Sequence, residues 1–256
     1  MSVEQGPAAD NAPPGGAARD LSIGVDIGGT FTDCIVATDA GEIITAKTPT
    51  TPHNRSTGFF DAIERAAAKL DVSVEVLMGR CRRLVHGTTT GTNAIVSRDG
   101  ARVGFITTEG HGHLLFMMRG SGRTAGLPPD ELLDISSTYK PESLVPRSLV
   151  LEVPERIDVD GDEIVPLDEA ALRLAVRQLV DAGVEAIAIS FLWSIRNDSH
   201  ERRAFELATQ EAPDLFITCG SDLVGSMGEY ERSTTAVMNA YIGPLMRRYI
   251  SAIEDG

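Results

Sequence analysis

The sequence has few basic residues and no long apolar run, and each scarcity excludes a class of protein. Lys and Arg number 23 against 37 Asp and Glu, so the formal net charge is −14. Because phosphate backbones are bound by basic surfaces, nucleic acid is excluded as the main partner. No apolar run approaches the roughly 20 residues that cross a bilayer, so we expect no membrane attachment.

Cysteine is also scarce, because only Cys34, Cys81 and Cys219 occur, far apart and odd in number. This excludes a disulfide framework and suits a reducing cytoplasm. The N-terminus has no basic segment followed by an apolar core, so no signal peptide is predicted. The pattern Gly-x-x-x-x-Gly-Lys-Ser/Thr is absent, which excludes P-loop chemistry. We therefore expect a cytoplasmic protein, and its 256 residues provide for one large domain or two modest ones.

The stretch from Ile23 to Val36 predicts a tight β-hairpin. Apolar runs over 21–27 and 31–37 flank Gly28-Gly29, a pair typical of short hairpin turns. Glycine permits backbone conformations that a Cβ atom would forbid, so the turn can expose its N–H groups. An ordinary hairpin is one interpretation, and a phosphate-binding turn is the other.

Polar residues around this turn favour the second interpretation. Thr30 and Thr32 flank the turn with hydroxyl groups, and a concave set of such donors suits a phosphate. Asp26 interrupts an apolar strand, where a carboxylate is costly unless something pairs with it. Asp26 and Asp33 together could hold Mg²⁺ through water, as this ion prefers.

A second loop, from Gly87 to Asn93, is rich in hydroxyl groups and lies between a predicted strand over 82–86 and a predicted helix over 94–98. Free N–H groups at a helix N-terminus suit an anion, a carbonyl or a carboxylate. A helix with a generous threonine cap is the simpler alternative. His86 ends the strand facing this loop, where a histidine could be structural, an acid or base, or an oxyanion donor.

The segment from Glu109 to Pro129 is rich in glycine and carries Arg119 and Arg123. Such a loop could close on an anionic substrate, or it could be a surface loop without a role. His111 and His113 have no cysteine or third histidine close by, so a metal pair is not predicted.

The remaining elements are predicted from periodicity and from turn and cap residues. We expect a disordered leader before residue 21, a third strand over 37–48, and a helix over 56–70 capped by Ser56. Further elements are a strand over 101–107, a hairpin over 149–165, a helix from Asp168 to Gly183, a strand over 185–193, a helix over 198–210 and a strand over 214–219. Alternating strands and helices of this kind imply an α/β subdomain with a partly parallel sheet.

A long helix is predicted over 229–253, with Pro244 kinking it. Val237, Tyr241, Leu245 and Tyr249 share one apolar face at steps of four residues. We expect this face to be exposed, as a partner site or as the entry to a further domain.

Several runs carry a family resemblance: Gly24 to Asp33, His86 to Ala94, Val153 to Arg156, and Glu229 to Arg232 followed by Asn239 to Tyr241. In combination they resemble the hydantoinase/oxoprolinase A-type family, from Leu21 to Ile253. Within it, Met118 to Arg123 and Phe191 to Asn197 are more similar to the acetone and acetophenone carboxylases than to the hydantoinases.

The resemblance implies an α/β protein, namely the first lobe of an actin-like (ribonuclease H-like) ATPase fold with an α/β subdomain. ATP and Mg²⁺ are the implied cofactors, with the metal held by Asp26 and Asp33. The residues expected at the ATP phosphates are Gly28, Gly29, Thr30, Phe31 and Thr32. The expected catalytic residues are Asp26, His86 and Arg119, and the expected substrate-binding residues are Thr88, Thr89, Asn93 and Arg123.

Family members use ATP to phosphorylate a carbonyl or amide oxygen. The carboxylases then join a ketone to bicarbonate with a hydantoinase B-type subunit as partner, whereas hydantoinases and 5-oxoprolinases hydrolyse a cyclic amide. We expect the carboxylase reaction, with lactam hydrolysis and a non-catalytic assembly subunit as alternatives. The expected divisions are a leader over 1–20, both loops over 21–147, an α/β subdomain over 148–228, and a helix over 229–256 leading to a C-terminal lobe that this sequence does not contain.

Overall fold

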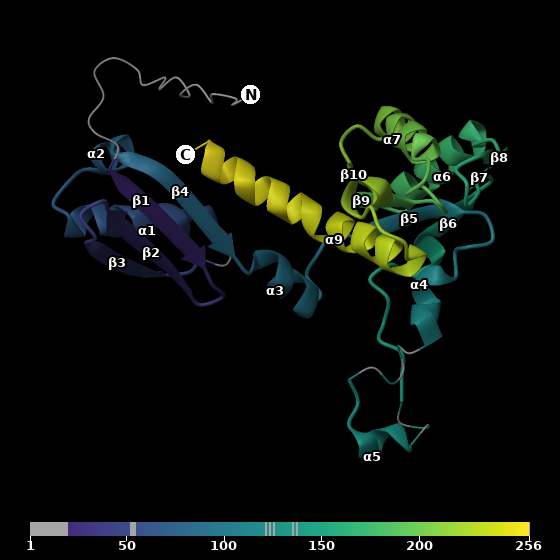
Figure 1. Cartoon of the computed structure of the whole chain (residues 1–256), viewed down its shortest axis with the longest axis horizontal. Coiled ribbons are helices and arrows are strands. Elements are labelled where there is room, and N and C mark those ends of the chain that lie inside the picture. Colours follow the sequence, from purple (N-terminus) through teal and green to yellow (C-terminus); the bar gives the residue numbers. More distant parts are fainter. Residues whose placement is uncertain are drawn as a thin grey trace, which may run out of the picture. The chain divides into compact units, whose positions relative to one another are not determined.

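A computed structural model describes residues 20–51, 55–120, 122, 124, 126–134, 136 and 138–255 (Figure 1). The expected leader, up to residue 19, and Arg123 lie outside the described residues. The chain divides into two compact units, one formed by Met1–Asn93 with Tyr249–Gly256 and the other by Ala94–Arg248. In the part of the chain that the structure describes, no helix is long and apolar enough to cross a membrane.

The first unit contains a four-stranded sheet and confirms the predicted hairpin. Its strands are β1 (Leu21–Ile27), β2 (Phe31–Thr38), β3 (Ile43–Pro49) and β4 (Cys81–Thr88), in the order β3-β2-β1-β4. Neighbours β1, β2 and β3 are antiparallel, whereas β4 runs parallel to β1. The helices of this unit are α1 (Arg55–Lys69), α2 (Val74–Gly79) and the start of α3 (Thr90–Val96).

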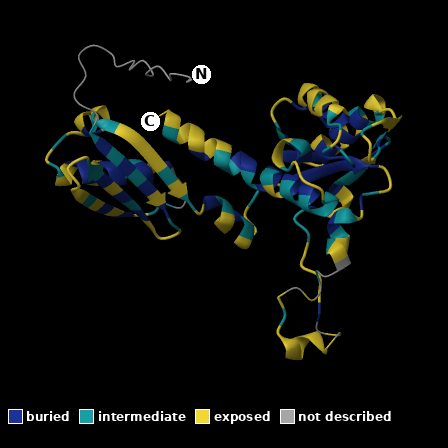
Figure 2. Cartoon of the chain, viewed as in Figure 1, coloured by how far each residue is buried: buried dark blue, intermediate teal, exposed yellow. Residues whose placement is uncertain are grey.

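Buried residues alternate with more exposed ones along β1, β2 and part of β3 (Figure 2). Alternate residues of β1, namely Ile23, Val25 and Ile27, are buried, and α1 covers this face with Phe59 and Ile63. Because successive side chains of a strand point to opposite faces, Asp26 lies on the other, exposed face. The carboxylate that interrupts the apolar strand therefore carries no burial cost.

The second unit is built on a parallel sheet in the order β10-β9-β5-β6. These strands are β5 (Val103–Thr108), β6 (Val150–Val153), β9 (Ala186–Ser190) and β10 (Phe216–Cys219), and a separate hairpin joins β7 (Arg156–Ile157) to β8 (Glu163–Val165). The helices are α4 (Leu114–Met117), α5 (Pro129–Leu132), α6 (Glu169–Asp181), α7 (Ser199–Glu211), α8 (Gly220–Leu223) and α9 (Glu229–Glu254), with 3₁₀ turns at Met118–Gly120 and Arg147–Leu149.

Helices cover both faces of this parallel sheet, and all residues of β5 and β9 are buried. On one face, a Cβ atom at Gly104 would collide with Leu179 of α6. On the other face, the Ser190 hydroxyl lies 3.1 Å from the hydroxyl of Ser233 in α9. Two-sided burial explains why these strands read as continuous apolar runs rather than alternating ones.

The structure divides the chain elsewhere than at residue 148. Because β5 pairs with both β6 and β9, the unit of the parallel sheet begins at Ala94 and extends to Arg248. Most of α9 also belongs there. The boundary between the two units is set by the pairing of strands that are far apart in the sequence. The pattern of residues within one strand does not indicate that pairing.

The expectation of an exposed apolar face on the last helix is wrong. Val237 and Tyr241 belong to the core of the second unit, and Tyr249 is buried within the first. The ring of Tyr241 fills the space beside Gly100, where any Cβ atom would collide with it. Helix α9 continues through Pro244. This face therefore gives no support to a non-catalytic assembly role.

Candidate functional site

The two loops singled out in the sequence lie side by side at one end of the first unit's sheet. Strands β1 and β4 are parallel neighbours, with Asp26 beside Gly87 and Ile27 beside Thr88. The turn after β1 and the loop after β4 therefore leave the sheet at the same edge. A Cβ atom on Gly29 would lie 3.7 Å from the side-chain nitrogen of Asn93.

The hairpin turn presents two backbone N–H groups. The Gly28 N–H donates to the carbonyl of Phe31 at 3.0 Å and closes the turn. The N–H groups of Gly29 and Thr30 have no hydrogen-bond partner among residues 20–51 or elsewhere in the described chain. These donors are of the kind that binds a phosphate oxygen.

Glycine is needed in this turn for a reason other than the one expected. Neither Gly28 nor Gly29 has a positive φ angle. Instead, a Cβ atom at Gly28 would lie only 3.1 Å from the carbonyl oxygen of Phe31. Close approach of two backbone segments, rather than a left-handed conformation, therefore selects glycine.

Thr50, which the sequence reasoning missed, braces the turn from behind. Its hydroxyl donates to the Gly28 carbonyl at 2.9 Å, and its N–H donates to the Thr30 carbonyl at 2.9 Å. Its hydroxyl also lies 3.2 Å from that of Thr32. Thr32 is fully buried, so its side chain supports the turn from inside, whereas Thr30 and Phe31 are exposed.

Two carboxylates lie next to this turn on the exposed face of the sheet. Asp26 and Asp33 are directly opposite one another in the β1–β2 register, an arrangement that is unfavourable for like charges unless a cation is near. Lys47 pairs with Asp33 at 3.0 Å and lies 4.8 Å from the centre of the Phe31 ring. The Asp26 carboxylate has no ion pair or hydrogen bond within the described residues.

The donor set fits a hydrated magnesium ion. Mg²⁺ keeps several waters and is commonly bound by one or two carboxylates together with substrate phosphates. Beside Asp26, Gly87 keeps the space open, since a Cβ atom there would lie 3.2 Å from an oxygen of that carboxylate. Among the described residues no group of three or more His, Cys, Asp or Glu side chains could hold a metal ion.

The hydroxyl-rich loop is shorter than expected and is partly a helix cap. Strand β4 extends to Thr88, and α3 begins at Thr90. The Thr88 hydroxyl accepts from the Thr90 N–H at 3.1 Å and lies 2.7 Å from its hydroxyl. Thr89 and Asn93 are exposed, and the Asn93 amide donates to the Thr89 hydroxyl at 3.2 Å. Thr88 thus serves the cap, while Thr89 and Asn93 face solvent.

His86 does not face this loop, which corrects the expected orientation. It lies within β4 rather than at its end, and its Nδ1 is 3.1 Å from the Val25 carbonyl. Its Nε2 is 2.5 Å from the Tyr249 hydroxyl, and its ring packs edge-on against Phe59. His86 therefore lies on the face that α1 covers, opposite to Asp26.

Arg119 is already paired in this structure. It lies in a 3₁₀ turn of the second unit, and its Nε is 2.6 Å from an oxygen of Glu231 in α9. Its φ of 53° and that of Met118, 48°, are both in the left-handed region, which is uncommon for residues other than glycine. The expected mobile loop is thus anchored at this residue.

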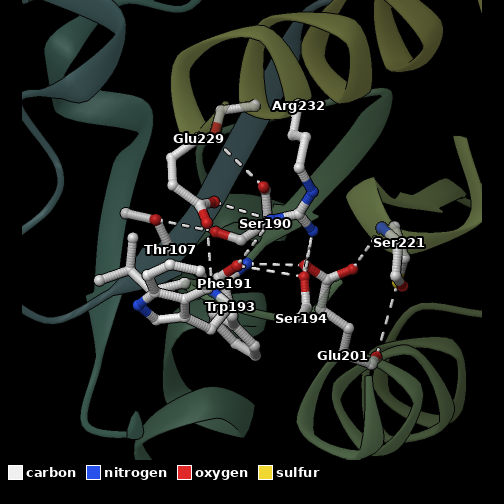
Figure 3. Close-up of polar contacts among 12 residues, drawn as sticks. Thr107, Ser190, Phe191, Trp193, Ser194, Glu201, Ser221, Glu229 and Arg232 are labelled. Carbon is white, nitrogen blue, oxygen red and sulfur yellow. Dashed lines mark hydrogen bonds and ion pairs between the residues drawn. The ribbon is translucent and has the colours of Figure 1, made fainter. Parts of the chain in front are cut away.

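A buried polar cluster in the second unit was not predicted as a site (Figure 3). The Arg232 guanidinium is fully buried and pairs with Glu229 at 2.7 Å and Glu201 at 3.4 Å. Glu201 also accepts from the Phe191 N–H at 2.8 Å and from the Ser194 hydroxyl at 2.6 Å. The Glu-Tyr-Glu-Arg run belonged to the family resemblance, but no residue pattern indicated that its arginine would be buried.

This cluster lies where parallel α/β sheets commonly bind ligands. In the order β10-β9-β5-β6, the chain adds β6 on one side of β5 and then β9 and β10 on the other, so the strand order reverses between β5 and β9. Ligands of parallel α/β sheets commonly bind at the carboxyl ends of the strands at such a point. Here the segment after β9, from Phe191 to Ser194, is held there by Arg232 and its carboxylates (Figure 3). The chain therefore fills its own crevice at this point.

Two solved structures share the fold. A nucleotide-free structure of acetone carboxylase, an enzyme of ATP-dependent acetone carboxylation, superposes with a TM-score of 0.86 at 27% identity, over 92% of this chain and 34% of that one. The ATP-dependent caprolactamase from Pseudomonas jessenii gives 0.80 at 37% identity, over 91% and 33%. The expected class is confirmed: a mixed α/β protein with the fold of hydantoinase-type ATPases.

Residues 22–212 match the hydantoinase/oxoprolinase N-terminal region, so the chain belongs to the hydantoinase/oxoprolinase family. It is 41% identical over 239 residues to the acetophenone carboxylase gamma subunit of Aromatoleum aromaticum, and 36% identical over 237 residues to the caprolactamase subunit alpha of Pseudomonas jessenii. These matches cover 91% and 92% of this chain but 32% and 33% of the relatives, so the chain spans about a third of their length.

Proposed function

We propose that this chain forms the ATP-site portion of an ATP-dependent enzyme that activates a ketone for carboxylation with bicarbonate. The observation that carries the proposal is the meeting of two loops at the carboxyl ends of β1 and β4, with Asn93 beside Gly29. The 41% identity to an acetophenone carboxylase subunit favours this reaction over others in the family.

The exposed groups at this edge fit Mg²⁺ and ATP. The unbonded N–H groups of Gly29 and Thr30 would hold phosphate oxygens, and Asp26 with Asp33 would hold Mg²⁺ through its waters. When bound, MgATP supplies the phosphoryl group that makes a carbonyl oxygen a leaving group or traps it as an enol. Gly28 and Thr50 keep the turn in shape.

The remaining candidates take supporting or substrate roles. The exposed side chains of Thr89 and Asn93 would orient the carbonyl compound by hydrogen bonds. His86 is a positioning residue, because it ties β4 to the Val25 carbonyl of β1. Arg119 would bind a substrate anion only by exchanging it for Glu231. A B-type subunit is the proposed partner, and Arg123 lies outside the described residues.

ATP-dependent lactam hydrolysis is the second candidate. It is favoured by the 36% identity to the caprolactamase subunit alpha and by the shared fold of the ATP-dependent caprolactamase structure. Both reactions begin with activation of a carbonyl oxygen, so the edge of β1 and β4 serves either one. The next step distinguishes them, because carboxylation forms a carbon–carbon bond whereas lactam hydrolysis breaks a carbon–nitrogen bond.

Product analysis of the full assembly tests this choice. The chain, joined to a C-terminal segment like that of its longer relatives and combined with a B-type subunit, is given ATP, isotopically labelled bicarbonate and ketones. We expect label in a β-keto acid and no ring opening of cyclic amides in a parallel reaction. Ring opening without fixation of label would assign the chain to the lactam hydrolases instead.

A further inference from the structure

A cleft of about 250 Å³ lies in the second unit, and none of the residues labelled in Figure 3 belongs to its lining. Its lining is mainly apolar and comes from α3, the α4 region, residues 141–144 and α9. The principal apolar members are Ile95, Leu115, Met118, Leu144, Val237 and Met238. Because a cavity of about 150 Å³ already holds a benzene ring, this cleft has room for a compound with one ring.

Among the described residues of the lining, one buried side-chain polar atom has no hydrogen-bond partner. The Thr234 hydroxyl is buried and makes no hydrogen bond within the described residues. Tyr230, Thr234, Val237 and Met238 follow at steps of three, four or seven on α9, so they share the helix face that lines the cleft. Buried hydroxyl groups are nearly always hydrogen-bonded, so a ligand that offers an acceptor oxygen would satisfy this one.

The charges around the cleft do not favour an ionic ligand. Arg98 donates to the Glu142 carbonyl at 2.8 Å, and Arg119, next to Met118, pairs with Glu231 at 2.6 Å. Both guanidinium groups thus have partners, whereas the Thr234 hydroxyl is the buried side-chain donor of the described lining that has none. The complementary ligand is therefore neutral and mainly apolar, with one acceptor.

We propose that this cleft binds a small neutral carbonyl compound, a ketone or lactam of one ring or less, with the Thr234 hydroxyl donating to its carbonyl oxygen. The inference rests on the proposed function only for the choice of this compound class. Binding needs neither ATP nor a partner subunit, so loss of turnover and loss of binding are separate results.

The test is an NMR titration of the whole chain with cyclohexanone and with methylenecyclohexane, which has nearly the same shape but no acceptor oxygen. We expect cyclohexanone to shift the signals of Thr234, Val237 and Leu144. Thr234→Val should weaken cyclohexanone binding about fivefold or more, as expected for loss of one hydrogen bond, and should leave methylenecyclohexane binding unchanged.

Two further variants serve as controls. Thr235→Val removes a hydroxyl on the same helix that already bonds to the Glu231 carbonyl at 2.7 Å, so it should leave cyclohexanone binding unchanged. Met238→Trp fills the cleft from a partly exposed position and should abolish binding of both compounds. The proposal would be overturned if cyclohexanone did not shift the NMR signals of the cleft residues. It would also be overturned if Thr234→Val and Thr235→Val weakened cyclohexanone binding equally, and the Thr234 hydroxyl would then be assigned a water molecule as its partner.

Discussion

Among single residues, Arg232 has the most demanding environment, because its guanidinium is fully enclosed by protein. Burying a charge is costly unless it is paired, and Glu201 and Glu229 supply the pairing. The guanidinium also donates to the Phe191 carbonyl at 3.3 Å. The residue thereby fixes the segment that follows β9 to the start of α9.

We expect Arg232→Met to destabilise the second unit by about 3–5 kcal/mol, because it leaves two carboxylates near the buried site without their cation. The measurement is urea unfolding followed by the fluorescence of Trp193, the single tryptophan of the sequence. Arg202→Met is the matched control, since Arg202 is exposed and pairs only with Asp198; it should cost about 1 kcal/mol or less. Similar unfolding curves for both variants would show that the buried pairs contribute little.

The turn residues show what the sequence predicted and what it did not. The hairpin, the exposed Thr30 and the pair of carboxylates follow from short-range patterns, namely alternation, a Gly-Gly turn and a lone Asp in an apolar strand. Thr50 could not be predicted as the brace, because its three contacts depend on how β3 returns to the turn. The predicted orientation of His86 was wrong because the strand continues to Thr88, so His86 lies within it rather than at its end.

At the scale of secondary-structure elements, α6 and α7 are clamped together by Glu211. This carboxylate pairs with Arg173 at 2.6 Å and with Arg177 at 2.8 Å, both on α6. Hydrogen bonds from Arg177 and then Arg173 lower the pKa of Glu211 to about 2. A lowered pKa means that the folded state favours the charged form, so this stabilisation is present above the ordinary pKa and is lost as the pH falls through the folded one.

The clamp therefore predicts a pH-dependent effect of Glu211→Gln. The melting temperature of the variant should be below that of the wild type at pH 7, and the difference should shrink between pH 4.5 and 2 and vanish near pH 2. Thermal unfolding at pH 7, 4 and 2.5 measures this. A difference that stays constant across the range would mean that the charge of Glu211 is not what joins the helices.

Strands β5, β9 and β10 were predicted near their actual positions, because buried strands read as short apolar runs between turn signals. Residues 150–153 were expected in the hairpin over 149–165, whereas β6 pairs in parallel with β5 and the hairpin joins β7 to β8. Their order was not predictable, since it depends on which strands pair across the chain. Strand β5 joins β6 and β9, so it belongs to a different unit than β4, the strand that precedes it in sequence. The apolar face of α9 was expected to be exposed for the same reason, as its partners in each unit are distant in sequence.

At the scale of the whole molecule, each of the two units carries a different proposed binding site. The first unit, with β1 and β4, carries the exposed amides and carboxylates proposed for MgATP. The second unit fills the crevice of its own parallel sheet with Arg232 and carries the apolar cleft beside Thr234. The chain covers about a third of relatives that act on ketones or lactams, so turnover is expected from the full assembly rather than from this chain alone.

The central claim is that ATP turnover uses the edge formed by β1 and β4, and phosphate release tests it most directly. The full assembly is given ATP, bicarbonate and a ketone, with wild-type chain, Asp26→Asn, or Asp39→Asn as the control, because Asp39 is an exposed carboxylate of the same unit that pairs with Arg82. We expect substrate-dependent phosphate release from wild type and Asp39→Asn, and a loss of about a hundredfold or more in Asp26→Asn without loss of folding. Undiminished release by Asp26→Asn would contradict the claim and place ATP chemistry elsewhere in the assembly.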